Sequence, residues 1–402
     1  MRRAFASTFC LYFFVFFALF AQPLQISTAA KAAVLINNKN GLILYEKHAD
    51  EKIFPASITK IATAYYILEK YPHLLKKNCL VSSDAITTVS SRRKASNDYQ
   101  TYPSFILESD GSTVDLKRGE AIDLLSLLYA VLLASGNDAA NVVAESVDKN
   151  ISAFMLHLND FLKEKGCKNT NFCNPHGLHH PEHTTTASDI AKLTTCALNN
   201  PYFSKIVGTE KYKLPASNKQ QEREIKQTNR LLKKEMKEFY PYALGVKTGY
   251  TSFAGYNLVA AAEKNGRSLT VVLLGYESSD NRYRDAKRLF EAAFKEKKIK
   301  KRILKKEKHF AIQIEGATDI LEATLKNDLF LEYYPSEEVP YKAYVYWNDL
   351  NLPIAKDCIV GKVKLVTEDG ILLTSSPLYA QKNITKSLLH RLKEFISHAF
   401  SK

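Results

Sequence analysis

The chain has 402 residues, of which 46% are hydrophobic and 24% charged, and its formal net charge is +14 at pH 7. This length predicts two or three domains, and this apolar content excludes an intrinsically disordered protein. The positive charge suits anionic partners such as lipid headgroups, wall polymers or nucleic acid, and by itself does not decide between them.

The N-terminus has the pattern of a secretory signal peptide. Two arginines precede the apolar run 9–20, which is too short for a comfortable bilayer span. Small residues follow at 27–33 and offer a signal peptidase its site. We therefore expect residues 1–29 to be a signal peptide and the protein to be exported. An uncleaved N-terminal membrane anchor is the alternative.

The next 265 or so residues predict a domain that opens and closes with strands around a helical middle. Residues 34–47 read as two strands around the turn signal 38–41, and a helix follows from Pro55. Further helices are expected at 121–136, 139–147, 151–166, 187–198 and 284–295, and strands at 255–264 and 268–276. These elements suit an α+β sheet that unites N-terminal and C-terminal strands.

A lysine-rich segment at 295–308 marks the domain boundary. The short segments after it are rich in Val, Ile, Thr and Tyr and predict a small all-β domain. The last stretch, 384–402, changes to a helical period and predicts a basic amphipathic helix. This helix is either docked on its own domain or held at a membrane surface, and the exported context favours the membrane.

Three short motifs occur in order along the chain. They are Ser57-x-x-Lys60 at a helix start, Ser135-Gly136-Asn137 at a helix end, and Lys247-Thr248-Gly249 before a strand. Each is weak alone, and the rival 91-SRRK-94 has the first spacing but no apolar helix behind it. Their order is similar to the signature of class A β-lactamases and penicillin-binding proteins.

The residue types of the first two motifs suit nucleophilic catalysis by a serine. A serine hydroxyl attacks once a base takes its proton, and Lys60 lies one helical turn from Ser57. Lys60 is a base only when neutral, and burial beside Lys247 would lower its pKa. We expect Ser135 to relay a proton to the leaving group and Asn137 to hold a substrate amide.

The third motif fits substrate binding. Lys247 and Thr248 offer a cation and a hydroxyl to a terminal carboxylate, and Gly249 belongs to the same binding segment. The backbone N–H groups of Ser57 and Tyr250 are candidates for an oxyanion hole.

The segments 55–64, 131–145 and 245–262 resemble the D-alanyl-D-alanine carboxypeptidases, the low-molecular-mass penicillin-binding proteins. The resemblance extends over nearly the whole mature chain. It implies a penicillin-recognising transpeptidase-like α+β domain at 30–295, with an antiparallel sheet and a helical subdomain. A small all-β domain at 296–380 and an amphipathic anchor helix at 381–402 would follow.

The resemblance also implies an activity. A D-alanyl-D-alanine carboxypeptidase removes the terminal D-alanine from peptidoglycan stem peptides through an acyl-enzyme, here at Ser57, and penicillins inhibit it covalently. It implies no cofactor, and partners limited to stem peptides, β-lactams and the membrane surface, on the outer face of the cytoplasmic membrane. One departure from the family pattern is the long polar segment 86–120, which affects the rim of the site.

A metal site is the first rival interpretation. The segment 176–183 holds four histidines, and Cys167 and Cys173 lie close in sequence. Their spacing matches no standard zinc pattern, so we expect a solvated loop and no metal. A Cys167–Cys173 bridge and two buried thiols are both open.

Other functions fit less well. D,D-endopeptidase activity on cross-linked peptidoglycan would use the same residues. A class A β-lactamase needs a deacylating glutamate, and Thr195 stands where its motif would place one. A non-catalytic wall-binding protein would not need the complete motif set. A nucleic-acid binder is disfavoured by export and by missing base-stacking motifs.

Overall fold

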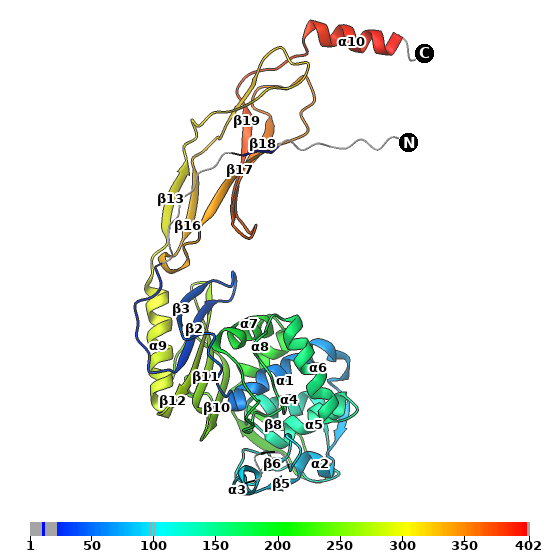
Figure 1. The fold of residues 1–402 in the computed structure, drawn as a ribbon, viewed down its shortest axis with the longest axis vertical. Helices are drawn as coiled ribbons and strands as arrows, with labels where there is room; N and C mark the ends of the chain where they lie inside the picture. The colour runs from blue at the N-terminus through cyan, green and yellow to red at the C-terminus, as the bar shows by residue number, and fades with distance from the viewer. Residues whose placement is uncertain (1–9, 13–21, 97–98, 100, 400–402) are drawn as a thin grey trace. The chain divides into compact units, whose positions relative to one another are not determined.

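The computed structural model describes residues 10–12, 22–96, 99 and 101–399. The chain forms two compact units, shown in Figure 1. One is residues 23–295, and the other is residues 296–402 together with the segment up to Gln22.

The first unit is built on a five-stranded antiparallel sheet with strand order β10-β11-β12-β2-β3. The N-terminal hairpin joins strands from the end of the unit, and Val34 of β2 lies opposite Val272 of β12. The expected union of N-terminal and C-terminal strands in one sheet is confirmed. The strands are β2 (Ala32–Asn37), β3 (Ile43–Lys47), β10 (Ala243–Thr251), β11 (Gly255–Lys264) and β12 (Arg267–Tyr276).

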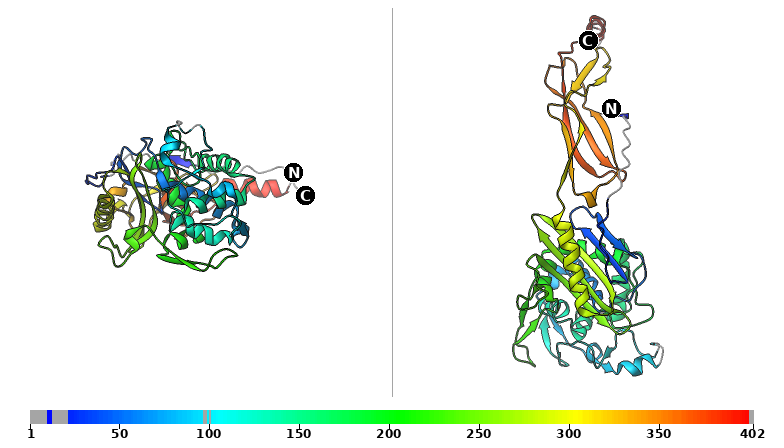
Figure 2. Two further views of the ribbon diagram at one scale, coloured as in Figure 1. Left: turned by 90° about the horizontal axis from the view of Figure 1, so that it is seen from below. Right: turned by 90° about the vertical axis from the view of Figure 1, so that its left-hand side faces the viewer.

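Helices cover both faces of this sheet. The long helix α9 (Ser279–Lys295) lies across one face, as the right-hand view of Figure 2 shows. On the other face α7 packs against β2 and β12 and leads into the helical subdomain. The other main helices are α1 (Thr59–Lys70), α4 (Leu124–Leu132), α5 (Asn137–Val147), α6 (Ile151–Glu164), α7 (Ala187–Leu198) and α8 (Pro201–Val207).

Several local signals in the sequence have the predicted structural effect. Thr186 caps α7, accepting a hydrogen bond from the Asp189 backbone N–H at 3.1 Å. The expected helix at 121–136 begins later, because Asp123 caps α4 and residues 121–123 form strand β7 (Ala121–Asp123). The strand expected after Lys247-Thr248-Gly249 is present as β11, but the motif itself lies inside β10, a strand that was not predicted.

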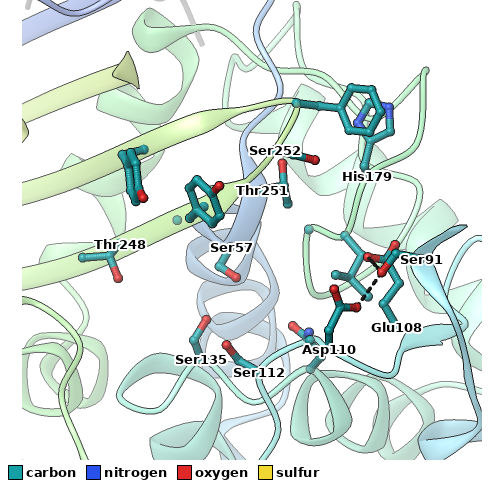
Figure 3. A pocket seen from close by; sticks show the side chains of 18 of the residues that line it. Ser57, Ser91, Glu108, Asp110, Ser112, Ser135, His179, Thr248, Thr251 and Ser252 are labelled. Carbon is teal, nitrogen blue, oxygen red and sulfur yellow. Dashed lines mark hydrogen bonds between the residues drawn. The ribbon is translucent and has the colours of Figure 1, made fainter. Parts of the chain in front are cut away.

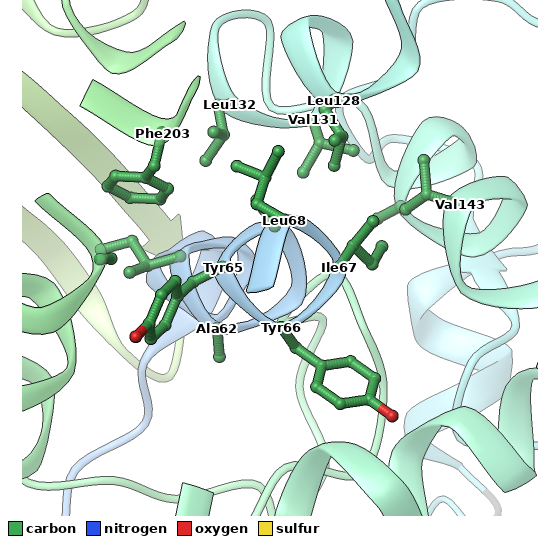
Figure 4. Close-up of a cluster of buried hydrophobic side chains, with 14 of the residues drawn as sticks. Ala62, Tyr65, Tyr66, Ile67, Leu68, Leu128, Val131, Leu132, Val143 and Phe203 are labelled. Atoms are coloured by element: carbon green, nitrogen blue, oxygen red, sulfur yellow. The ribbon is translucent and has the colours of Figure 1, made fainter. Parts of the chain in front are cut away.

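Helix α1 lies at the centre of the first unit. Every residue from Thr59 to Leu68 is buried, and Figure 4 shows its apolar side chains meeting those of α4, α5 and α8. A helix that is surrounded on all sides is a core helix, and it cannot shift without repacking its neighbours. Truncating Leu68, which is 1% exposed, to alanine would cost about 2–5 kcal/mol. The start of α1 is therefore a rigid platform.

Short elements complete the first unit. The described residues of the polar segment 86–120 form small pieces of structure around α3. The short elements are η1 (Ala56–Ile58), η2 (Pro72–Leu74), β4 (Asn78–Leu80), α2 (Ser83–Ile86), β5 (Thr88–Val89), α3 (Ser91–Ala95), β6 (Leu107–Glu108), β8 (Lys211–Leu214), β9 (Arg223–Lys226) and η3 (Arg230–Leu232).

In its described residues, the second unit is all-β apart from a short 3-10 turn and a C-terminal helix. Its main sheet has the order β1-β17-β18-β19-β15-β14, and β13 pairs with β16. Its apolar core includes Trp347 and Val363. The strands are β1 (Cys10–Tyr12), β13 (Ile299–Leu304), β14 (Phe310–Ile312), β15 (Leu321–Thr324), β16 (Leu329–Tyr333), β17 (Tyr341–Trp347), β18 (Ile359–Thr367) and β19 (Leu372–Ala380), and the turn is η4 (Pro335–Glu337).

The two ends of the chain bear on the membrane predictions. The apolar run 9–20 of the expected signal peptide falls mostly outside the described residues, and only β1 of it is described. The C-terminal helix α10 (Leu388–Ala399) begins later than expected, because Ile384 is buried in the β-unit core. None of the helices in the described part of the chain is long and apolar enough to cross a membrane.

Candidate active site

A cavity of about 680 Å³ opens beside the start of α1, and residues from all three sequence motifs line it (Figure 3). Six of the eight expected site residues line it. They are Ser57, Ser135, Asn137, Thr248, Gly249 and Tyr250. The other two, Lys60 and Lys247, are fully buried. Segments that are nearly 200 residues apart in the sequence therefore meet at one cleft.

Ser57 and Lys60 form a hydrogen-bonded pair. Ser57 lies in the turn η1, and Lys60 lies in the first turn of α1 with its Nζ 3.1 Å from Ser57 Oγ. Lys60 Nζ also donates to Asn137 Oδ1 and to the His176 carbonyl oxygen, each at 2.7 Å. Burial holds the pKa of Lys60 well below its usual value, and the Lys247 charge lowers that pKa further, against a smaller opposing effect of Asp138.

Two glycines let the backbone close around Ser57. A Cβ on Gly249 would lie 3.0 Å from the Pro55 carbonyl oxygen and 3.1 Å from the Ser57 nitrogen. On the other side, a Cβ on Gly177 would lie 1.9 Å from the Ala56 carbonyl oxygen. Ala56 itself has φ of 50°, a left-handed conformation that is uncommon for residues with a Cβ. Ser57 is thus held in place by contacts that larger residues would break.

The second motif closes the cleft from the helical side. Ser135 also has a left-handed backbone, with φ of 61°, and it is 6% exposed. The buried carboxylate of Asp138 accepts hydrogen bonds from the backbone N–H groups of Val114 and Leu116. These bonds tie the 112–116 segment to the start of α5, where Asn137 faces Lys60.

The third motif supplies the sheet side of the cleft. Lys247 Nζ donates to the Thr248 carbonyl oxygen at 2.9 Å. Burial, and then the Arg282 charge, lower the pKa of Lys247 to about 7. The Thr248 and Thr228 hydroxyls are 2.8 Å apart. Arg282 reaches from α9 to the Gly249 carbonyl oxygen at 3.3 Å and also lines the cavity.

Sequence reasoning missed Thr228 and Arg282 because neither stands in a motif. Arg282 lies in a polar stretch where arginine is unremarkable, and only the fold brings it behind β10. The carbonyl of His176 was also missed, since a backbone acceptor leaves no trace in the residue type.

Ser91 of the rival pair lines the same cavity, whereas Lys94 is buried behind it, and both have partners that differ from those of Ser57 and Lys60. Ser91 Oγ donates to Asp110 Oδ1 at 2.5 Å and to Glu108 Oε2 at 3.2 Å, as drawn in Figure 3. Lys94 is 1% exposed, and its Nζ lies 3.4 Å from Glu108 Oε1. The carboxylates of Glu108 and Asp110 thus accept hydrogen bonds from the Ser91 hydroxyl, and Glu108 also pairs with Lys94. Ser91 therefore has carboxylate partners, whereas the partner of Ser57 is the lysine amine.

The histidine-rich loop is not solvated throughout, so that prediction is wrong for His176 and His183. His176 is fully buried, donating from Nε2 to the Phe105 carbonyl oxygen and accepting at Nδ1 from the Leu178 N–H. His183 is 2% exposed and bonds the Thr59 hydroxyl and the Cys173 N–H. Both rings therefore support the loop that delivers the His176 carbonyl to Lys60.

Cys167 and Cys173 are not bridged to each other in the structure. Both are free thiols. Cys167 Sγ donates to the Asp189 carbonyl oxygen at 3.4 Å, inside the helical subdomain. Cys173 lies at the edge of the histidine-rich loop and is half-buried.

Comparison with known proteins gives this geometry a family. A family model described as D-alanyl-D-alanine carboxypeptidase, peptidase family S11, matches residues 19–278. The D-alanyl-D-alanine carboxypeptidase DacF of Bacillus subtilis is 30% identical over 366 residues, which are 90% of this chain and 88% of that protein. The chain belongs to the D-alanyl-D-alanine carboxypeptidase family. Its members are serine peptidases and hence hydrolases.

Solved structures of this carboxypeptidase family share the fold. Penicillin binding protein 5 of Haemophilus influenzae aligns with a TM-score of 0.60 at 25% identity, covering 90% of this chain and 99% of that chain. The DD-transpeptidase of Streptomyces K15 aligns with a TM-score of 0.58 at 26% identity, covering 67% of this chain and 98% of that chain. The expected penicillin-recognising fold with a separate β domain is therefore confirmed.

Proposed function

We propose that this protein is a serine-type D-Ala-D-Ala carboxypeptidase that removes the terminal D-alanine from peptidoglycan stem peptides. The observation that carries the proposal is the buried Lys60 Nζ, 3.1 Å from Ser57 Oγ in the wall of a cleft. A serine paired with a lysine is an activated nucleophile for acyl transfer. Family membership supplies the substrate class.

The hydrogen-bond partners of Lys60 accommodate the neutral amine that general-base catalysis requires. A neutral amine has two N–H donors, and two carbonyl oxygens, Asn137 Oδ1 and that of His176, accept from Lys60 Nζ. Its lone pair is then left for the Ser57 hydroxyl. Burial and Lys247 favour the same state, because both lower the pKa of Lys60.

The reaction then proceeds in two steps. Ser57 Oγ gives its proton to Lys60 and bonds to the carbonyl carbon of the penultimate D-alanine, and the backbone N–H groups of Ser57 and Tyr250 receive the developing oxyanion. The C–N bond breaks, and the leaving D-alanine amine takes a proton by way of Ser135. Water then cleaves the ester to Ser57 and releases the shortened peptide.

The remaining motif residues bind the substrate. Asn137 has its carbonyl oxygen engaged with Lys60, so its amide nitrogen is the atom offered to a substrate carbonyl. The Thr248 hydroxyl receives the terminal carboxylate, and Gly249 gives it room beside β10. Lys247 and Arg282, both buried, add positive potential there.

The activity test uses a pentapeptide ending in D-Ala-D-Ala. Wild type and Ser91→Ala should release D-alanine, and Ser57→Ala should not. Release only from cross-linked peptide dimers would reassign the protein as a D,D-endopeptidase. Rapid penicillin hydrolysis without peptide cleavage would reassign it as a β-lactamase, and activity that survives in Ser57→Ala would refute the nucleophile.

We also propose that helix α10 holds the protein to a membrane surface. Its large apolar side chains are between 52% and 80% exposed, and Arg391 and Lys393 on the same helix are exposed as well. Such a helix lies in the interface of an anionic bilayer. The exposed apolar residues are Leu388, Leu389, Leu392, Phe395 and Ile396.

The test of this anchor is a truncation. Deletion of residues 388–402, which leaves the buried Ile384 in place, should release the protein from anionic vesicles. The single change Phe395→Glu should weaken binding without unfolding the β unit, since that side chain is 74% exposed. Undiminished vesicle binding by both variants would refute the anchor.

We further propose that the protein is exported and acts on the outer face of the cytoplasmic membrane. The hydrogen bonds of residues 24–30 suggest a position for its mature N-terminus. The Leu24 N–H donates to the Leu44 carbonyl oxygen, the Ala29 N–H donates to Asp285, and Lys47 donates to the Ala30 carbonyl oxygen at 2.7 Å. We therefore move the proposed domain start from 30 to 23 and keep the other boundaries. N-terminal sequencing of the secreted protein should begin at or before Leu24, and a start at Lys31 would contradict this.

A further inference from the structure

Three side chains with metal-binding atoms converge at the base of the histidine-rich loop. They are Cys173, His180 and Glu182, and one ligand atom from each lies within 4.8 Å of the other two. Cys173 and His180 are half-buried, and Glu182 is exposed. This trio differs from the histidine and cysteine set suggested by sequence proximity, because Cys167, His176 and His183 are committed to other bonds.

The backbone around the trio is firmly held. Asn171 and Thr184 pair as an antiparallel bridge, with both N–H···O distances between 2.9 and 3.0 Å. One step inward, the rings of Phe172 and His183 stack at 4.8 Å. Cys173 and Glu182 follow this bridge along the two segments, and the Cys173 N–H donates to His183 Nδ1 at 3.0 Å.

The loop between Cys173 and Glu182 forms part of the wall of the catalytic cleft. Between Cys173 and Glu182 the chain supplies the His176 carbonyl that accepts from Lys60. It also supplies Gly177, Leu178 and His179 to the cavity lining. A link across the base would therefore restrain residues that touch the reaction.

The ligand set selects the metal. Sulfur, nitrogen and carboxylate oxygen ligands at about 2.0–2.3 Å from the ion are those of Zn²⁺, whose tetrahedral site brings them about 3.4 Å apart. Rotation of the exposed Glu182 side chain and of the Cys173 side chain would bring the ligand atoms to that spacing, and Cys173 Sγ would give up its 3.7 Å hydrogen bond from Asn171 Nδ2. The long 3.2 Å hydrogen bond from the Glu182 N–H to His180 Nδ1 can give way to the metal. Water would complete the fourth position.

We propose that Cys173, His180 and Glu182 form a Zn²⁺ site that clips the base of the loop lining the catalytic cleft. Cys173 binds as a thiolate and releases its proton to solvent. The site is separate from the serine chemistry, so zinc stabilises the loop but does not take part in acylation.

The experiment measures Zn²⁺ binding to the full mature chain by equilibrium dialysis, with Co²⁺ as a spectroscopic probe of thiolate ligation. Wild type and Ser57→Ala should each bind one Zn²⁺ per chain, raise the thermal unfolding midpoint with Zn²⁺, and show a thiolate-to-Co²⁺ charge-transfer band. Cys173→Ser should lose the band, and Glu182→Gln should bind Zn²⁺ at least about tenfold more weakly. Cys358→Ser is the matched control, because its thiol lies in the β unit.

Two results would overturn the proposal. One is the absence of saturable Zn²⁺ binding by wild type, and the other is binding that Cys173→Ser and Glu182→Gln leave unchanged. Thermal unfolding in chelator-treated buffer shows whether each variant is folded. If Cys173→Ser does not fold, Glu182→Gln decides the question, since that side chain is exposed. Because Ser57→Ala retains this site, failure here leaves the proposed peptidase function untouched.

Discussion

The environment of Lys60 predicts a specific effect of placing a charge at position 137. Asn137→Asp keeps the oxygen that lies 2.7 Å from Lys60 Nζ but adds a carboxylate charge to it. A carboxylate stabilises the protonated lysine, so the pKa of Lys60 must rise. A base with a raised pKa is neutral in a smaller fraction of molecules at any pH below that pKa.

The size of the effect follows from the distance. At 2.7 Å and an effective dielectric constant near 20, Coulomb's law gives an attraction of about 6 kcal/mol as a ceiling. Opposite charges this close shift measured pKa values by about 1–3 units. We therefore expect the rising limb of the pH–acylation profile to move upward by about 1–3 pH units, with rates on that limb about 10- to 1,000-fold lower.

The assay is the second-order rate constant for acylation by a labelled penicillin, measured from about pH 5 to about pH 10. Asn137→Ala is the matched control. Asn137→Ala also removes the amide that we assign to substrate binding, so the plateau of its pH–acylation profile should fall. Because this variant adds no charge, the rising limb of its profile should not move to higher pH. A limb that stays in place in Asn137→Asp would refute Lys60 as the base. A limb that moves upward equally in both variants would show that charge is not the cause.

Two further predictions concern the loop beside Ser57. Gly177→Ala should cost more than about 3 kcal/mol of unfolding free energy, because its Cβ meets a carbonyl oxygen at 1.9 Å where φ is +90°. Gly266→Ala, with φ of +75° and open space, should cost only about 1 kcal/mol by urea denaturation, and equal costs would contradict the reasoning. Burial, helped by Lys60 and Lys94, keeps the pKa of His176 well below 6.5, so the unfolded chain alone takes up a proton there as the pH falls. Stability should decline by up to about 1.4 kcal/mol per pH unit below 6.5 from this residue, and His176→Gln should flatten the decline; an unchanged slope would count against a neutral buried His176.

The sequence predicted the elements that local physics controls. The apolar periodicity after Pro55 gave α1, and the Thr186 cap gave the start of α7, because both signals act within a few residues. The motif order predicted that Ser57, Ser135 and Thr248 would share a site, and the structure places all three on one cavity.

What the sequence did not predict depends on contacts between distant segments. Nothing local distinguishes Arg282 from a surface arginine, yet the fold buries it behind β10. The rival Ser91 was set aside because no apolar helix follows it, and nothing in the sequence predicted that it would line the same cleft as Ser57. Ser91 differs from Ser57 in its electrostatic surroundings, because Ser91 donates hydrogen bonds to Glu108 and Asp110. No local sequence pattern predicts that arrangement.

The presence of two serines in one cleft, each three residues before a lysine, also defines the most direct test. After incubation with a penicillin, digestion and mass spectrometry should locate one covalent adduct on the peptide that contains Ser57. The adduct should disappear in Ser57→Ala and persist in Ser91→Ala. An adduct on Ser91, or one that survives in Ser57→Ala, would contradict the account.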